Sequence, residues 1–473
     1  MKAPRPALFV AVVALATLKV SPCAPRLDAA QAAPLASDAE IRRMLVERID
    51  VQRQSVGIVA GVVEPAGRRV VSYGSVGRGD TRPLNGDTVF EIGSITKVFT
   101  SLLLAEAVQR REVSLADPIS KFLPEKVKVP ERGGRAITLQ ELSMHTSGLP
   151  RLPANMKPKD PANPYADYSV EDLYSFISAY QLTRDPGARY EYSNLGGGLL
   201  GHVLSLRAGT EYEALVRTRI TDPLGMTSTS IALTPAMRGR LAQGHSATLQ
   251  PVDNWDLPTL AGAGALRSTA NDLLAFVAAN LGLVKTSLAP AMASMLEPRQ
   301  PTGMPAVEIA LGWHVSSVHG KTIVWHNGGT GGYRTFIGFD PAARAGVAVL
   351  SNAGTAAGPD DIGRHILDPE TPLLVLKPPS QHTETTINPK LLDRYVGRYQ
   401  LATNVFLTVA RSGDRLNAQL TGQPAFEIFP ESETQFFLKV VEAQLTFELG
   451  ADGKASAVVL HQNGASPRAP RVE

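Results

Sequence analysis

Cysteine is almost absent from this sequence: among 473 residues there is one, Cys23. A single cysteine cannot form a disulfide within the chain, so cysteine usage leaves the redox compartment open. The sequence also lacks a large excess of either positive or negative charge. Charged residues make up 19% of the chain, the net charge is +3 and no long basic run occurs, so we expect no nucleic-acid partner.

Several catalytic signatures are missing as well. The histidines show no metal-ligand spacing such as H-E-x-x-H, so we expect no metal. No G-x-S-x-G elbow occurs, which argues against an α/β-hydrolase. No glycine-rich nucleotide loop follows an expected strand, which argues against a dinucleotide. We therefore expect no cofactor.

Long apolar runs are lacking except near the N-terminus. Lys2 and Arg5 precede "ALFVAVVALATL", which is short for a membrane span, and small residues follow it. This order is typical of a secretory signal peptide, predicted here over residues 1–33, with a periplasmic or secreted mature chain. A lipid anchor at Cys23 is the alternative, although Pro22 stands where a small residue is expected. Membrane contact is expected only through these segments.

The remaining sequence, in a chain that is 44% hydrophobic, suits a globular protein of two domains. Strand patterns lie at both ends of residues 34–370, with helical patterns and loops rich in Pro and Gly between them. We predict an α+β domain: an antiparallel sheet built from distant pieces, flanked by helices and carrying a helical insertion. Residues 371–390 are rich in Pro and Thr and are predicted to be a linker. The short alternating runs of residues 391–473 predict a small antiparallel β-barrel or sandwich.

The chemistry centres on "SITKVFTSLLLAEAVQ", which begins at Ser94 and is predicted to be a helix over residues 94–109. Ser94 and Lys97 are then neighbours on one helix face, with Cβ atoms about 5–6 Å apart. A serine hydroxyl needs a base to become a nucleophile, and an amine kept neutral by burial can serve. Ser-x-x-Lys also arises by chance, and the alternative is a helix-capping serine beside a solvated lysine.

Two further motifs follow along the chain. "YEYSNLGGG" contains Tyr192 and Asn194, and "IVWHNGGTGG" contains His326, Gly328 and Gly329. Each has a structural alternative. Tyr192 could be a half-buried strand tyrosine and Asn194 a helix cap. His326 could be an edge-strand histidine, and the glycines could form a hairpin turn.

In this order, Ser-x-x-Lys, Tyr-Ser-Asn and His-x-Gly resemble the serine penicillin-recognising enzymes, most closely the class C β-lactamase branch. That branch includes penicillin-binding proteins, D-amino-acid peptidases and family VIII carboxylesterases. The resemblance covers nearly all of residues 40–355, and the C-terminal segment resembles a lipocalin-like barrel.

The resemblance implies roles for the matching positions. Ser94 would form an acyl-enzyme, and Lys97 and Tyr192 would share the work of the general base. The backbone N–H groups of Ser94 and Gly329 would form the oxyanion hole. Asn194, His326 and Gly328 would bind substrate, whereas His145 is expected to brace a loop.

The expected function is that of an exported serine hydrolase of the β-lactamase or D-Ala-D-Ala carboxypeptidase type. Its substrate would be a D-amino-acid peptide, a β-lactam or an ester. The alternatives are a family VIII-type carboxylesterase and a penicillin-binding protein that acylates without efficient turnover. His326 departs from the pattern, because β-lactamases carry the lysine of Lys-Thr-Gly there. A histidine with an ordinary pKa of about 6.5 would lose its charge, and its hold on a substrate carboxylate, as the pH rises.

Overall fold

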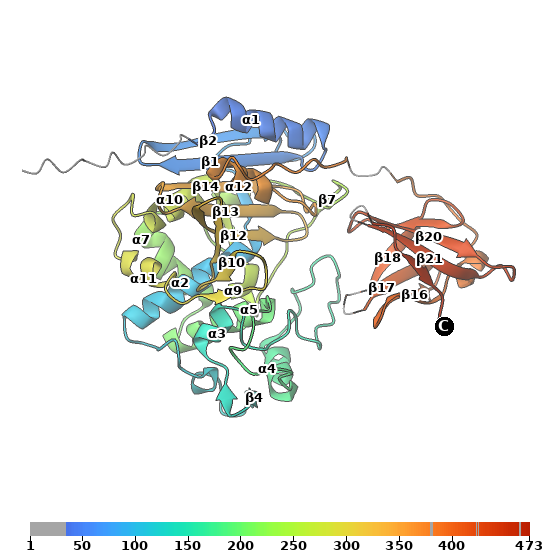
Figure 1. Ribbon diagram of the computed structural model, residues 1–473, viewed down its shortest axis with the longest axis horizontal. Helices are drawn as coiled ribbons and strands as arrows, with labels where there is room; N and C mark the ends of the chain where they lie inside the picture. The colour runs from blue at the N-terminus through green and yellow to red at the C-terminus, as the bar shows by residue number, and fades with distance from the viewer. Residues whose placement is uncertain (1–34, 379–381, 422, 424, 463–464) are drawn as a thin grey trace, which may run out of the picture. The chain divides into compact units, whose positions relative to one another are not determined.

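The computed structural model describes residues 35–378, 382–421, 423, 425–462 and 465–473 (Figure 1). The predicted signal peptide and Cys23, together with part of the predicted linker, lie outside the described residues. Among the residues that are described, no helix is long and apolar enough to cross a membrane.

The larger sheet joins strands from both ends of the first part of the chain, as predicted. Its eight antiparallel strands run in the order β2-β1-β14-β13-β12-β11-β10-β9, and Ile58 of β1 pairs with Ser351 of β14. The strands are β1 (Gly57–Glu64), β2 (Gly67–Gly74), β9 (Gln300–Pro301), β10 (Val307–Ile309), β11 (His314–Val318), β12 (Lys321–Gly329), β13 (Arg334–Asp340) and β14 (Ala345–Ser351).

Helices cover both faces of this sheet (Figure 1). Alternate residues of β1 point to opposite sides: Ile58 packs with α1 (Asp38–Val46) and α12 (Asp360–Leu367), and Val59 packs with the core on the other side. That second core contains α2 (Thr96–Gln109) and α10 (Ala270–Asn280). Burial on both faces explains why the central strands are nearly continuous apolar runs.

The predicted helical insertion lies between β2 and β9, where short helices alternate with loops. A two-stranded sheet of β3 (Val89–Glu91) and β8 (Arg267–Thr269) fixes the segment that leads into Ser94. The smaller pairs are β4 (Glu131–Arg132) with β5 (Arg135–Ala136) and β6 (Gly244–His245) with β7 (Pro251–Val252). The helices are α3 (Leu139–Ser143), α4 (Val170–Ala179), α5 (Asn194–Ala208), α6 (Tyr212–Val216), α7 (Asp222–Leu224), α8 (Pro235–Arg238), α9 (Ala261–Gly264) and α11 (Ala289–Ser294).

The C-terminal segment forms a second eight-stranded antiparallel sheet, in the order β15 to β22. A bridge between Tyr399 and Arg471 joins its first and last strands, so the sheet is a nearly closed barrel, as predicted. Its strands are β15 (Gly397–Ala402), β16 (Val405–Ser412), β17 (Arg415–Leu420), β18 (Ala425–Pro430), β19 (Gln435–Phe437), β20 (Ala443–Leu449), β21 (Ala455–Gln462) and β22 (Arg468–Pro470). Tyr395, Phe436 and Phe447 are buried within it.

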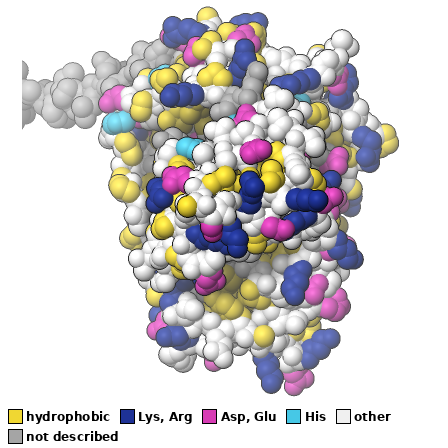
Figure 2. Space-filling model, turned by 90° about the vertical axis from the view of Figure 1, so that its right-hand side faces the viewer, with side chains coloured by type: hydrophobic (Ala, Val, Ile, Leu, Met, Phe, Trp, Pro, Cys, Tyr) yellow, Lys and Arg dark blue, Asp and Glu magenta, His cyan; other side chains and the backbone are white. Residues whose placement is uncertain are grey.

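The surface carries charges of both signs. On the face shown in Figure 2, Lys and Arg side chains lie among Asp and Glu side chains. This mixture agrees with the low net charge of +3.

Candidate active site

Ser94 lies in a tight turn that precedes a buried helix. The predicted start of the α-helix at Ser94 is wrong by two residues: a 3₁₀ turn spans η2 (Gly93–Ile95), and α2 begins at Thr96. The reason is Gly93, whose φ of +51° turns the chain against the end of β12. A Cβ atom on Gly93 would lie 2.6 Å from the backbone nitrogen of Gly329. Within residues 91–105, Ser94 is the one residue that is not buried.

Lys97 reaches Ser94 from the first turn of α2. Its Nζ lies 3.0 Å from Ser94 Oγ, 2.9 Å from Asn194 Oδ1 and 2.7 Å from the carbonyl oxygen of Ala263. The side chain is buried, and this burial lowers the pKa of the amine well below its ordinary value of 10.5. The guanidinium of Arg151 acts on the pKa in the same direction.

The three neighbours of Lys97 determine where its lone pair points. A neutral amine has two N–H donors and one lone pair, whereas the carbonyl oxygens of Asn194 and Ala263 can only accept hydrogen bonds. Once both N–H groups are used in this way, the lone pair faces the hydroxyl of Ser94. The amine is therefore oriented to take the proton of that hydroxyl.

Glycines make room for Lys97 beside α5. A Cβ atom on Gly197 would lie 3.0 Å from Lys97 Cε, and one on Gly262 would lie 2.9 Å from the carbonyl oxygen of Gly197. The "GGG" of α5 and the "AGAG" of α9 thus let both helices approach the lysine. The carbonyl of Ala263 was not predicted, because a backbone acceptor has no side-chain signature, although this small-residue run marks a close approach.

Tyr192 lies directly before α5, with its ring beside Lys97. The Nζ atom of Lys97 is 4.9 Å from the ring centroid. Burial raises the pKa of the Tyr192 phenol above its ordinary value, and a hydrogen bond with Ser94 opposes that rise. The phenol is consequently protonated at neutral pH, and Tyr192 lies in a loop rather than in a strand.

Asn194 is the first residue of α5, but it does not cap the helix. The cap is Ser193, whose Oγ accepts a 2.8 Å hydrogen bond from the backbone N–H of Gly196. The side chain of Asn194 is thereby left to contact Lys97 through Oδ1 and to donate through Nδ2 to the Tyr165 hydroxyl at 3.0 Å. Tyr165 in turn lies 5.5 Å from the ring of Trp255, centroid to centroid.

Gly328 and Gly329 form the end of β12 rather than a turn. The hairpin loop follows them, closed by a hydrogen bond of 3.1 Å from the Thr330 N–H to the Tyr333 carbonyl. A Cβ atom on Gly328 would collide with the carbonyl oxygen of Ile92. Side chains larger than hydrogen would therefore push β12 away from the turn that carries Ser94.

His326 is fully buried and does not offer a positive charge. Burial lowers the pKa of its imidazole well below the ordinary 6.5, and nearby His314 acts in the same direction. Its Nδ1 donates to the carbonyl oxygen of Asn327 at 2.6 Å, and its Nε2 has no partner among the described residues. The expectation of a charge that is lost near pH 6.5 is thus wrong, because the imidazole is already neutral there.

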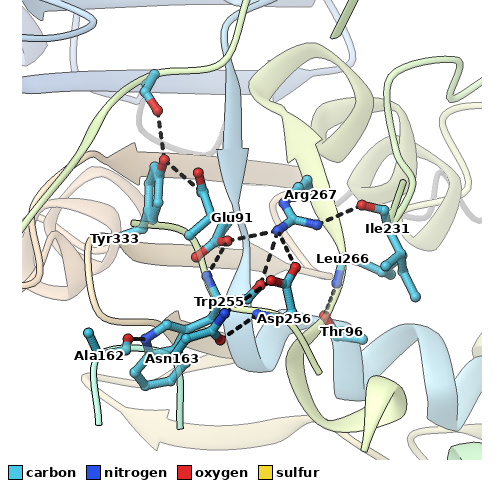
Figure 3. Close-up of polar contacts among 12 residues, drawn as sticks. Glu91, Thr96, Ala162, Asn163, Ile231, Trp255, Asp256, Leu266, Arg267 and Tyr333 are labelled. Carbon is cyan, nitrogen blue, oxygen red and sulfur yellow. Dashed lines mark hydrogen bonds and ion pairs between the residues drawn. The ribbon is translucent and has the colours of Figure 1, made fainter. Parts of the chain in front are cut away.

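The segment before Ser94 is held by a buried ion pair (Figure 3). Arg267 of β8 lies 3.2 Å from Glu91 Oε1 of β3, and the same oxygen accepts a 3.0 Å hydrogen bond from the Trp255 N–H. The Trp255 indole donates to the Ala162 carbonyl at 2.8 Å. These contacts tie the loop around residue 162 to the strand that leads into the nucleophile turn.

The described residues hold no group of three or more His, Cys, Asp or Glu side chains arranged to bind a metal ion. The geometry instead brings Ser94, Lys97, Tyr192 and Asn194 together, and places Gly329 next to the backbone of residue 93.

Comparison with known proteins identifies the family to which this chain belongs. A family profile described as Beta-lactamase matches residues 41–368. The chain belongs to the β-lactamase family. It is accordingly a serine hydrolase related to β-lactamases. A second family profile, described as a domain of unknown function (DUF3471), matches residues 381–469.

Individual relatives are similar to this chain over most of their own length. The D-alanyl-D-alanine-carboxypeptidase/endopeptidase AmpH of Escherichia coli (strain K12) is 30% identical over 352 residues, which cover 69% of this chain and 88% of that protein. A penicillin-binding protein of Bacillus subtilis (strain 168) is 27% identical over 424 residues, covering 85% and 92%. The solved structure of a β-lactamase/D-alanine carboxypeptidase from Yersinia pestis superposes with a TM-score of 0.61 at 25% identity, covering 71% of this chain and 96% of that one.

Proposed function

We propose that the chain hydrolyses D-amino-acid peptides or β-lactams through an acyl-enzyme on Ser94. The observation that carries this proposal is the 3.0 Å contact between Lys97 Nζ and Ser94 Oγ, because the other two contacts of Nζ are carbonyl oxygens, which can only accept hydrogen bonds. The names of its relatives, which include D-alanyl-D-alanine carboxypeptidases and β-lactamases, support the choice of substrate.

In the first step, Lys97 takes the proton from Ser94 Oγ while the oxygen attacks the substrate carbonyl carbon. The resulting oxyanion accepts hydrogen bonds from the backbone N–H groups of Ser94 and Gly329. Gly328 allows the close approach that brings these two groups together, and Asn194 orients the acyl part of the substrate.

The tetrahedral intermediate then loses its leaving group. Tyr192, protonated and hydrogen-bonded to Ser94, gives its proton to the leaving atom and recovers one from the Lys97 ammonium. A water molecule next attacks the Ser94 ester with the amine as base. The proton returns to Ser94 Oγ and releases the acid.

A carboxylesterase is the second candidate function, and the neutral state of His326 favours it. Because its burial lowers the pKa of His326 well below 6.5, this residue offers no charge to a substrate carboxylate, which would suit a neutral ester. A penicillin-binding protein that acylates without turnover differs only in the fate of the Ser94 ester.

The experiment that tests the proposal is labelling of the purified protein with a slow β-lactam, followed by peptide mass mapping. We expect one adduct on the peptide that contains Ser94, and none in Ser94→Ala. Ser205→Ala is the matched control, because Ser205 is a half-buried helix serine bonded to the Gly201 carbonyl. Labelling of another serine, or turnover that survives in Ser94→Ala, would contradict the proposal.

Export and domain organisation complete the proposal. We expect a signal peptide over residues 1–33, a hydrolase domain over 34–370, a linker over 371–390 and a barrel over 391–473. N-terminal sequencing of the protein recovered from the periplasm or medium tests the first of these. A folded fragment that ends near residue 374 and still acylates would support the domain boundary.

A further inference from the structure

Arg151 follows the "HTSGLP" segment and faces the active site. Its backbone is fixed, because its carbonyl oxygen accepts hydrogen bonds from the N–H groups of Asn194 at 3.0 Å and Leu195 at 3.2 Å. Its side chain is exposed, and the guanidinium carbon lies 5.2 Å from the centroid of the Tyr192 ring. The charge thus stands over a ring that we place in the catalytic machinery.

This guanidinium has no anionic partner. Within the part of the chain that the structure describes, Arg151 makes no side-chain hydrogen bond and no ion pair. The acidic residue of the neighbouring loop, Glu191, is instead paired with Arg184 at 2.7 Å and lies 3.6 Å from Arg189. The charge of Arg151 therefore remains available to a ligand.

Two other basic groups near Ser94, His326 and Lys97, cannot play that part. His326 is buried and neutral, and the Lys97 amine is buried with both N–H groups used by carbonyl oxygens. A guanidinium stays charged at every working pH, and its planar donors match the two oxygens of a carboxylate. The Arg151 charge, 5.2 Å from the centroid of the Tyr192 ring, lowers the pKa of Lys97 and of Tyr192, in opposition to the effect of burial on the tyrosine.

The position of Tyr192 indicates which end of the substrate Arg151 meets. If Tyr192 gives its proton to the leaving atom, the leaving group lies along Tyr192, under the guanidinium. We propose that Arg151 binds a carboxylate on the leaving group of the substrate. This inference rests on the proposed acyl-enzyme function, and it names the substrate class as one with an anionic leaving group.

The test uses two thioesters with the same acyl group: one releases thioglycolate, and the other releases the corresponding carboxamide thiol. Because both form the same acyl-enzyme, their ratio of kcat/KM reports acylation alone. In Arg151→Gln we expect this ratio, carboxylate over carboxamide, to fall by about 10- to 100-fold, the usual effect of a hydrogen bond to a charged group. A change in the pKa of Lys97 or Tyr192 would alter kcat/KM for both thioesters by the same factor, so it would leave their ratio unchanged.

The matched control is Arg189→Gln. Arg189 is an exposed arginine in the loop just before Tyr192, but its guanidinium lies 3.6 Å from the carboxylate of Glu191. In Arg189→Gln the ratio of kcat/KM for the carboxylate and carboxamide thioesters should stay at the wild-type value. An unchanged ratio in Arg151→Gln, or an equal loss of kcat/KM for both thioesters, overturns the inference about Arg151. If turnover still depends on Ser94 in that case, the proposed function remains intact. If Ser94→Ala still hydrolyses both thioesters, the proposed function fails and the inference falls with it.

Discussion

The imidazole of His145 lies 4.4 Å from the ring of Tyr192, centroid to centroid. His145 also holds the chain on both sides of that tyrosine. Its carbonyl oxygen accepts a hydrogen bond from the Glu191 N–H at 2.8 Å, and its Nδ1 accepts one from the Ser193 N–H at 3.2 Å. His145 therefore braces a loop, as the sequence suggested, and the braced residue is Tyr192.

We expect His145→Ala to lower kcat by roughly 10- to 100-fold with little change in KM, since displacement of Tyr192 by about 1 Å impairs proton transfer rather than binding. His145→Asn should recover part of the loss, because its side-chain oxygen can accept from the Ser193 N–H. Steady-state kinetics of the two variants measure this. His202→Ala, which removes a histidine bonded to Tyr174, is the control. An increase in KM alone, without rescue by asparagine, would argue against a positioning role.

The depressed pKa of Lys97 has a consequence for stability. Between this lowered pKa and the unfolded value of about 10.4, the unfolded chain binds one proton more than the folded chain. Wild-type stability therefore rises with pH in this range, by up to about 1.4 kcal/mol per pH unit. Lys97→Met lacks this dependence, so its stability relative to wild type should decline from about pH 8 to about pH 10.

Unfolding in urea, followed by tryptophan fluorescence, measures this difference. The three tryptophans are Trp255, Trp313 and Trp325, so the signal comes from the part of the chain that contains the site. Lys121→Met, which removes an exposed lysine paired with Asp117, serves as the control. A stability difference for Lys97→Met that is constant over this range would mean that the folded protein keeps this lysine charged.

The sequence predicted most elements of the fold and a lysine amine neutralised by burial, but not the charge state of His326. The sheet of distant strands and the C-terminal barrel follow from local patterns of apolar and turn residues, whereas the three ordered motifs were picked out by their resemblance to a known family. The neutral state of His326 depends on burial by residues distant in the sequence, such as His314. The Ala263 carbonyl and the unpaired Arg151 likewise depend on tertiary contacts, since neither a backbone oxygen nor a lone arginine has a motif.

Gly328 offers a direct test of the close approach between β12 and the Ser94 turn. Because a Cβ atom there would collide with the Ile92 carbonyl oxygen, Gly328→Ala should separate the backbone N–H groups of Ser94 and Gly329, which we propose as the oxyanion hole. We expect kcat/KM to fall by about 100-fold for every substrate. Gly239→Ala is the matched control, because the nearest atoms to its Cβ would lie 3.6 Å away. Wild-type activity in Gly328→Ala would show that catalysis does not need the close approach that Gly328 allows.

The buried pair of Glu91 and Arg267 should contribute to stability mainly through the cost of breaking it (Figure 3). Arg267→Met leaves a buried carboxylate without its cation, and we expect a loss of about 3–5 kcal/mol in the free energy of unfolding. The double variant Glu91→Leu, Arg267→Met should lose less, because no charge remains buried. Arg299→Ala, which removes a partly exposed arginine 3.7 Å from Glu308, should change stability by less than about 1 kcal/mol. Equal losses in the single and double variants would show that the ion pair is not the relevant interaction.

The last prediction concerns pH and the substrate carboxylate. A histidine anchor with an ordinary pKa would make kcat/KM for the carboxylate thioester fall, relative to the carboxamide thioester, as the pH rises through about 6.5. In this structure His326 is neutral because its burial lowers its pKa, whereas a guanidinium is charged throughout this pH range. The ratio of the two kcat/KM values should therefore stay flat from about pH 6 to about pH 8, because any titration of Lys97 changes both values alike. Wild-type protein and the two thioesters suffice for the measurement. A ratio that falls with a midpoint near 6.5 would show that His326 holds the carboxylate after all, and a flat ratio that drops only in Arg151→Gln would assign that task to Arg151.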